Sequence, residues 1–122
     1  MSPKNEMDLK CRFPLVTRSL GAIECGDGWV LLLRNALGKL DRIAQRDVMS
    51  RPRRPHLVVT RISEKHGLLD LHTRTTDGEI ERIVEEAFKA AERTCEQCGS
   101  VGRRRLLASG LVRCVCDRCA AK

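Results

Sequence analysis

Two pairs of cysteines near the C-terminus constrain this chain more than any other feature. Each pair has the spacing C-x2-C, and seventeen residues separate Cys95 and Cys98 from Cys116 and Cys119. A C-x2-C turn directs two thiolates toward one ion, and two such turns complete a tetrahedral shell of four sulfurs. The spacing therefore predicts one zinc ion (Zn2+) held by all four cysteines.

A further cysteine leaves an alternative open for the second pair. Cys114 precedes Cys116 by two residues, so three thiols compete for two places. The C-x2-C spacing favours Cys116 with Cys119 and leaves Cys114 as a core thiol; replacement of Cys116 by Cys114 is the alternative. Cys11 and Cys25 have no neighbour at ligand spacing, and we expect both to be small buried side chains.

The cellular compartment decides how paired cysteines are interpreted. The first residues are polar and charged, without an apolar stretch of signal-peptide type, and no run reaches the roughly 18 apolar residues of a membrane span. We therefore expect a cytoplasmic protein that does not enter a membrane, in which cysteines bind metal; disulfides are the alternative. Four thiolates fill the shell of a zinc ion, and the chain has no His-x-Glu motif of the deaminase type. The sequence thus predicts a structural zinc ion and no enzymatic activity.

Two stretches predict amphipathic helices. Apolar residues recur at helical spacing over residues 28–47, and Asp27 stands at the expected N-cap position. Residues 77–93 have one apolar stripe and an acidic opposite face. Thr76 and Glu79 have the spacing of a capping box at the start of this second helix.

The segments around these helices predict strands and an arm. A β-branched run followed by an alternating run predicts an antiparallel hairpin over about residues 56–75, with its turn at about residues 63–67. Short strands are expected at about residues 103–108 and 111–115, with a turn between them. Residues 1–26 show no sustained period, and we interpret them as an extended arm.

The predicted fold class is α+β, in the order helix, antiparallel β-hairpin, helix and C-terminal zinc ribbon with four cysteine ligands. Residues 1–94 are expected to form the α+β domain with its extended N-terminal arm, and residues 95–122 a ribbon-like tail docked on it. A tail of this length buries too little apolar surface to fold alone, so it needs a metal ion.

The charge of the chain favours an acidic partner. The net charge is +7, and residues 95–122 contribute about +4, which falls to about +2 with zinc and four thiolates bound. Guanidinium groups suit phosphate contacts, and arginines cluster in two places: Arg51, Arg53 and Arg54, and Arg103, Arg104 and Arg105. Aromatic residues make up only 2% of the chain, which argues against a stacking platform for single-stranded bases. A solvated basic face is the alternative interpretation of both clusters.

The segment Gly26-Asp27-Gly28-Trp29 has two interpretations. In the first, Asp27 caps the helix and Trp29 anchors the core. In the second, the segment is a ligand-contacting loop beside the turn of the hairpin, since loops often carry binding residues.

Four motifs together are typical of one group of proteins: Glu-Cys-Gly-Asp-Gly-Trp at 24–29, Ser-Glu-Lys-His-Gly-Leu at 63–68, Thr-Cys-Glu-Gln-Cys-Gly at 94–99 and the last cysteine pair. On these motifs, over about residues 10–120, the chain resembles a group of small phage and prophage-encoded proteins whose function is mostly unassigned. His66 stands where the family has an aromatic residue. The resemblance implies an origin in a mobile genetic element and a zinc-binding tail, and it implies no activity.

These features lead to two functional hypotheses. The first is a small, non-enzymatic, zinc-binding accessory protein of a phage or prophage that contacts nucleic acid or a nucleoprotein complex. The alternative is a protein–protein inhibitor or regulator of host machinery, comparable to an anti-CRISPR protein, that acts by steric occlusion.

Overall fold

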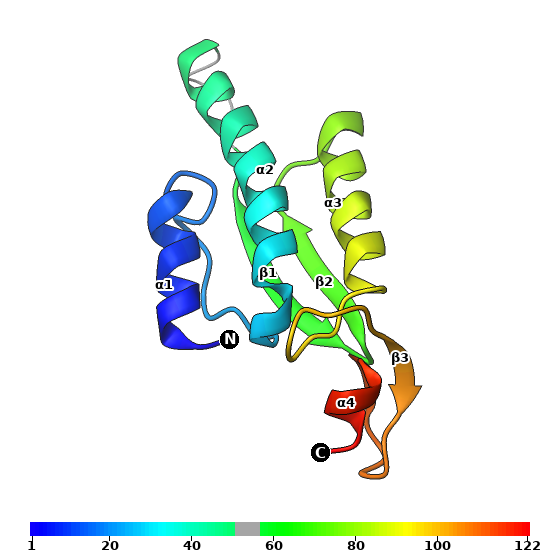
Figure 1. The fold of residues 1–122 in the computed structure, drawn as a ribbon. Coiled ribbons are helices and arrows are strands. Elements are labelled where there is room, and N and C mark those ends of the chain that lie inside the picture. Colours follow the sequence, from blue (N-terminus) through cyan, green and yellow to red (C-terminus); the bar gives the residue numbers. More distant parts are fainter. Residues whose placement is uncertain (51–56) are drawn as a thin grey trace.

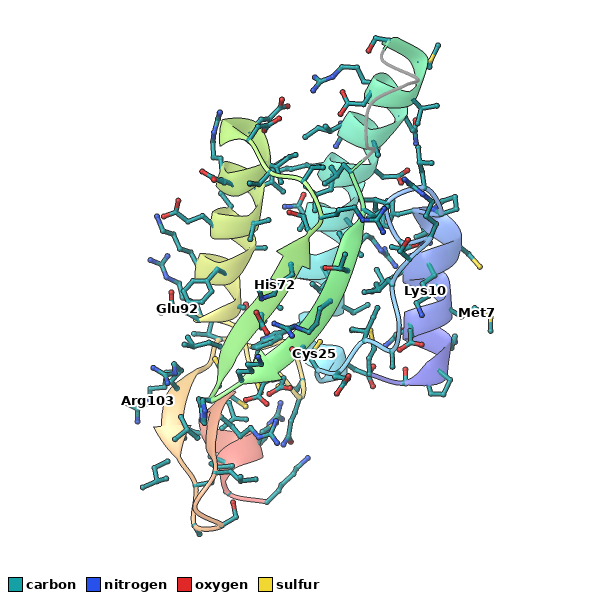
Figure 2. All side chains as sticks on the ribbon, turned by 180° about the vertical axis from the view of Figure 1, so that it is seen from behind. Met7, Lys10, Cys25, His72, Glu92 and Arg103 are labelled. Atoms are coloured by element: carbon teal, nitrogen blue, oxygen red, sulfur yellow. The ribbon has the colours of Figure 1, made fainter. Side chains whose placement is uncertain are left out.

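The fold is α+β, in the predicted order of helix, hairpin, helix and C-terminal cysteine cluster. The computed structural model describes residues 1–50 and 57–122. Helices α2 and α3 lie side by side over one face of the hairpin (Figure 1), and its other face is turned toward the viewer in Figure 2. In the part of the chain described, no helix is both long enough and apolar enough to cross a membrane. The central elements are α2 (Val30–Ser50), β1 (Val59–Lys65), β2 (Leu68–Thr73) and α3 (Gly78–Ala91).

The predicted extended N-terminal arm is wrong, because Pro3–Arg12 form helix α1. Ser2 is its N-cap, since the Ser2 hydroxyl accepts a hydrogen bond from the Asn5 amide at 3.4 Å. Proline in the first turn suits the helix, because its missing amide has no intrahelical role there. Leu9 is the buried side chain of α1, so the helix has too little apolar periodicity to be recognised from its pattern.

The apolar core lies between α2, α3 and the inner face of the hairpin. Trp29, the residue immediately before α2, is fully buried, and its Nε1 donates to the Thr94 carbonyl at 2.9 Å. Its predicted role as a core anchor is therefore confirmed. Other core residues come from α2 (Leu33, Leu37, Leu40), from the hairpin (Ile62, Leu69, Leu71) and from α3 (Ile80, Ile83, Ala87).

Both predicted helix caps are wrong. The 3-10 turn η1 (Asp27–Trp29) leads into α2, and Gly26 stands at its N-cap. The Asp27 carboxylate instead accepts hydrogen bonds from α1, namely from the Ser2 amide at 2.8 Å and from Asn5 Nδ2 at 3.0 Å. The N-cap of α3 is Asp77 rather than Thr76, since Asp77 Oδ1 accepts from the amide of the third residue of the helix at 2.9 Å.

The predicted antiparallel hairpin is confirmed, with a shorter turn than expected. Strand β1 continues to Lys65, so only His66 and Gly67 turn the chain, with φ of 53° and 80°. Positive φ at both positions gives a turn whose twist matches that of the strands. Glu64 closes the turn, because its Oε2 accepts from the Gly67 amide at 2.7 Å. A bridge from Glu24 to Ser63 occupies the other edge of β1.

Candidate metal centre

The four predicted ligands converge on one point. The sulfurs of Cys95, Cys98, Cys116 and Cys119 all lie within 4.8 Å of one another, and the Cys98 and Cys116 sulfurs are 3.7 Å apart. Four Zn–S bonds of about 2.3 Å in a tetrahedron place sulfurs about 3.8 Å apart. The cluster therefore fits a single metal ion. Cys95 and Cys119 are buried and Cys98 is exposed, so the ion would lie close to the surface.

The first knuckle, residues 95–99, is a tight turn after α3. The Cys95 amide donates to the Ser100 carbonyl at 2.7 Å, and the Gly99 amide donates to the Cys95 carbonyl at 2.9 Å. Gly99 has φ of 82°, a left-handed conformation that glycine adopts without strain. Hydrogen bonds from the Ser100 hydroxyl and amide lower the pKa of Cys98 to about 6, which favours the thiolate that a metal binds.

The second knuckle joins a short hairpin to a single helical turn. Strands β3 (Arg103–Leu106) and β4 (Val112–Val115) pair antiparallel, and α4 (Asp117–Ala120) follows. The Cys116 sulfur caps α4, since it accepts from the Cys119 amide at 3.4 Å. The hydrogen bond from the Cys119 thiol to Cys116 raises the pKa of Cys119 to about 12. Four thiols this close cannot all ionise unless a cation replaces their protons, and a bound dication supplies that charge.

Cys114 lies outside the cluster. Its buried sulfur is 3.3 Å from the carbonyl oxygens of both Ala91 and Thr94, at the end of α3. Cys114 is therefore the core thiol that its spacing favours, and Cys116 joins the cluster. Cys25 is buried as expected, and burial raises the pKa of its thiol to about 12. Cys11 is exposed, so its predicted burial is wrong; it lies on the solvent side of α1.

The segment before α2 packs directly on the first knuckle, a contact that the sequence analysis missed. The Gly28 amide donates to the Glu96 carbonyl at 2.7 Å, and the Gly26 amide donates to Glu96 Oε2 at 2.9 Å. A Cβ atom at Gly28 would stand 2.1 Å from the Cys95 carbonyl oxygen. Neither glycine has positive φ, so their role is to allow close backbone approach. The sequence signal for this contact was the pair of glycines on either side of Asp27, the first residue of η1.

The turn of the first hairpin also contacts the ribbon. Arg113 Nη1 lies 2.8 Å from Glu64 Oε1 and 3.6 Å from Glu96 Oε1. Burial raises the pKa of Glu96, and the Gly26 amide and Arg113 partly offset it. Arg104 Nε donates to the His66 carbonyl at 3.0 Å. One arginine of β4 and one of β3 therefore tie the ribbon to the hairpin.

The arginines of the predicted cluster at residues 103–105 have different surroundings in the structure. Arg103 and Arg104 are exposed, but Arg105 Nη2 is paired with Asp117 Oδ1 at 2.8 Å. Strand alternation also places Arg104 on the opposite side of β3 from Arg103 and Arg105. The other predicted cluster lies outside the residues that the structure describes, namely Arg51, Arg53 and Arg54.

Further basic side chains lie on the open face of the hairpin, and the sequence analysis did not single them out. Arg61 Nη2 and Lys65 Nζ lie 3.1 and 3.2 Å from Asp70 Oδ2, and His72 Nε2 contacts the other oxygen. Partial burial opposes ionisation of Asp70, but the hydrogen bonds from Lys65 and His72 outweigh it and lower the pKa. Figure 2 shows His72 on this face. The signal was the alternation along the strands, which places all four residues on one side.

Comparison of the chain with protein-family models, with curated proteins and with solved structures found no match. The cysteine cluster can hold one metal ion with four sulfurs and so fasten the two knuckles together. The surrounding basic groups can contact anions.

Proposed function

We propose that the cluster holds one structural zinc ion and that the protein is a non-enzymatic accessory protein. The sulfur separations and the amide and hydroxyl donors around Cys95 and Cys98 support a saturated tetrathiolate site. Such a shell has no free position for a substrate. Elemental analysis of the purified protein should find one zinc ion per chain; iron, which also accepts four tetrahedral thiolates, would contradict this proposal.

The surface that supports a binding role is a basic strip, formed by Arg61, Lys65 and Arg104. Arg61 and Lys65 share the open face of the hairpin. Arg104 adjoins Lys65, because its guanidinium binds the carbonyl of the next residue, His66. The strip thus crosses from the hairpin to the ribbon, and the cysteine cluster holds the ribbon strand in place.

The chemistry of the strip favours a phosphate backbone. Guanidinium and ammonium groups bind phosphate oxygens, and Asp70 is the acidic residue that the paired strands place among them. No aromatic side chain belongs to the strip, so we propose contact with duplex backbone or with a nucleoprotein complex rather than stacking on single-stranded bases. The resemblance to phage and prophage proteins supports an origin in a mobile element. The main support for this proposal is that the strip continues from the β1–β2 hairpin to the β3–β4 hairpin, which belong to two separate sheets.

Salt dependence is the sharpest test of this function. The protein should bind a 20-base-pair DNA or RNA duplex at low salt, and its affinity should fall steeply as salt rises. The combined changes Arg61→Ala, Lys65→Ala and Arg104→Ala should lower the salt slope by about one for each phosphate contact removed.

A matched variant separates this effect from net charge. Replacing Arg12, Arg42 and Lys89 by alanine removes the same charge from helices away from the strip, and it should change affinity much less. Undetectable duplex binding at low salt, or equal losses in the two triple variants, would contradict the proposed function.

Exposed apolar residues of the ribbon support the alternative, a protein–protein inhibitor or regulator. Val101, Leu106 and Leu111 are 86, 71 and 52% exposed, so these large side chains are available to a partner. A bacterial lysate protein retained by the native chain but not by the variant with serine at all three positions would support this role. Equal retention by both proteins would contradict it.

A further inference from the structure

Among the residues that the structure describes, strand β2 leaves one edge without a partner. The first sheet has two strands there, and the far edge of β1 is already used, since Val59 donates to Val16 and Glu24 bridges Ser63. Within residues 1–50 and 57–122, no backbone hydrogen bond joins Leu68–Thr73 to a segment other than β1. Alternate amides and carbonyls of β2 therefore point away from the sheet, where a further strand can pair with them.

A groove runs between β2 and α3. Its volume is about 380 Å³, which lies in the range of ligand-binding clefts. Leu71 of the strand and Val84 and Phe88 of the helix supply apolar lining, and both helical residues are half-buried. An edge strand beside an apolar helix face is an arrangement that binds extended peptides, because the strand supplies backbone hydrogen bonds and the groove accepts alternate side chains.

The charge of the groove indicates which peptide it accepts. Glu81, Glu85 and His72 are its titratable lining residues, and no lysine or arginine lines it among the residues described. Glu85 is paired with Lys89 at 3.3 Å, whereas Glu81 contacts only the Thr76 hydroxyl within the described part of the chain. The groove is thus an acidic site on a chain of net charge +7, and it complements a cationic segment.

We propose that this groove binds an extended basic segment of a partner protein, which adds as a third strand to β2. Apolar side chains of the segment would contact Leu71, Val84 and Phe88, and its lysines or arginines would approach Glu81 and Glu85. A second copy of this chain is a poorer occupant, because pairing of two β2 edges would bring two acidic rims together. The groove shares no residue with the basic strip, so this proposal does not depend on nucleic-acid binding.

The first experiment selects ligands from a displayed library of random 12-residue peptides, with the full-length zinc-loaded protein as target. The expected result is enrichment of sequences in which apolar residues alternate with lysine or arginine. Titration of an enriched peptide should shift the NMR signals of β2 and α3 amides and leave those of α1 unchanged. Absence of enrichment, enrichment of acidic sequences, or shifts confined to other elements would overturn the proposal.

Backbone methylation tests strand addition directly. An N-methyl group removes one backbone donor, so methylation at alternate peptide residues should abolish binding in one register and spare it in the other. A helical or purely electrostatic complex would not show this alternation. Equal binding of the two methylated peptides would therefore overturn the proposal, as would a dimer of the protein whose formation shifts the same β2 signals.

Charge reversal tests the acidic rim. The double variant Glu81→Lys and Glu85→Lys should weaken binding of the enriched peptide about tenfold, since each change replaces an exposed attraction by a repulsion. The matched double variant Glu86→Lys and Glu92→Lys alters the same helix and its C-cap, outside the groove, and should retain most of the affinity. Equal losses in the two variants would show that net charge, not the groove, governs binding.

Discussion

The helical body and the cysteine ribbon are stabilised by different physics. The body buries a continuous cluster of leucine, isoleucine, valine and Trp29 side chains between its helices and its hairpin. The ribbon has its own cluster, in which only Cys95, Val115 and Cys119 are buried. Three small side chains offset little of the entropy lost when the ribbon becomes ordered. A metal ion bound by the four thiolates would replace the core that the ribbon lacks.

The contact between the two regions is polar and close rather than apolar and broad. It consists mainly of backbone hydrogen bonds from Gly26 and Gly28, the ion pairs of Arg113 and the buried thiol of Cys114. We therefore expect the ribbon to depend on a bound metal ion for its internal order and on two glycines for its position. Each dependence can be removed separately.

Metal removal should give the largest difference between the two regions. Treatment with a strong chelator should disorder residues 95–122, because structural zinc contributes about 10 kcal/mol or more to the folding of such units. Helices α2 and α3 should persist, because their core contains none of the four ligands. Amide hydrogen exchange before and after chelation measures both outcomes.

Two cysteine variants accompany this experiment. Cys116→Ala should reproduce the effect of the chelator, and zinc content should fall well below one ion per chain. Cys11→Ser changes an exposed thiol outside the cluster and should retain both zinc and exchange protection. If the ribbon amides stay protected from hydrogen exchange after complete metal removal, the ribbon does not need the ion in place of an apolar core, and this prediction is wrong.

Substitution of Gly28 should change the position of the ribbon on the body without disturbing the internal order of the ribbon. In Gly28→Ala the new Cβ would stand 2.1 Å from the Cys95 carbonyl oxygen, so the knuckle must move away from η1. We expect a loss of about 3 kcal/mol in the free energy of unfolding, at the upper end for overpacking of a fixed contact. Chemical denaturation measures the loss, and zinc content should stay at one ion per chain.

Gly21→Ala is the matched control. Its Cβ would meet no atom within 4 Å, and Gly21 does not have positive φ, so stability should change by less than about 0.5 kcal/mol. Similar losses at the two glycines would indicate a general effect of alanine instead of a clash at the knuckle.

Local patterns in the sequence were sufficient to predict the elements that are defined by near neighbours. The spacing of Cys95 and Cys98, the alternation of the hairpin and the apolar stripes of α2 and α3 each depend on residues within one or two turns. Helix α1 was missed because Leu9 is its only buried side chain, so it lacks a stripe. Its start signal, Ser2 followed by proline, carries less weight than periodicity.

Long-range contacts were not predictable in this way. Asp27 is separated from Ser2 by 25 residues, and Gly26 is separated from Glu96 by 70. Asp27 looks like a cap for its own helix because capping is the commonest local use of such a residue. Only the tertiary fold shows that Asp27 contacts a different helix and that the neighbouring glycines contact the first knuckle.

Replacement of Cys114 should have a smaller effect on stability, and it tests whether Cys114 is a core thiol or a metal ligand. Cys114→Ala removes a buried sulfur from beside the carbonyls of Ala91 and Thr94, which should cost about 1 to 2 kcal/mol of unfolding free energy. Zinc content should remain at one ion per chain, in contrast to Cys116→Ala. Loss of zinc from the Cys114 variant would indicate that Cys114 is a zinc ligand and would contradict its role as a core thiol.

The smallest expected effect concerns the attachment of α1 to the body. Asp27→Ala removes the acceptor of two hydrogen bonds, from the Ser2 amide and from Asn5 Nδ2, and should cost about 1 kcal/mol or less because the site is exposed. Faster amide exchange should be confined to α1. Glu24→Ala changes another exposed carboxylate of the same segment, whose side chain makes no hydrogen bond to the described residues, and it should leave α1 unchanged.

The pH dependence of this attachment has a definite sign. The Ser2 amide and Asn5 stabilise the Asp27 carboxylate, so they lower its pKa below the ordinary value of 3.8. The folded protein therefore binds this proton less readily than the unfolded chain does, and the stabilisation is present above pH 3.8 and lost as the pH falls through the folded pKa. Exchange of α1 amides in the native protein should accelerate over that acidic interval more than in the Asp27→Ala variant, which lacks this carboxylate. An acid response of α1 that is identical in the two proteins would mean that α1 is held by its other contacts, such as the acceptance by Glu6 of the Ile23 amide at 2.7 Å.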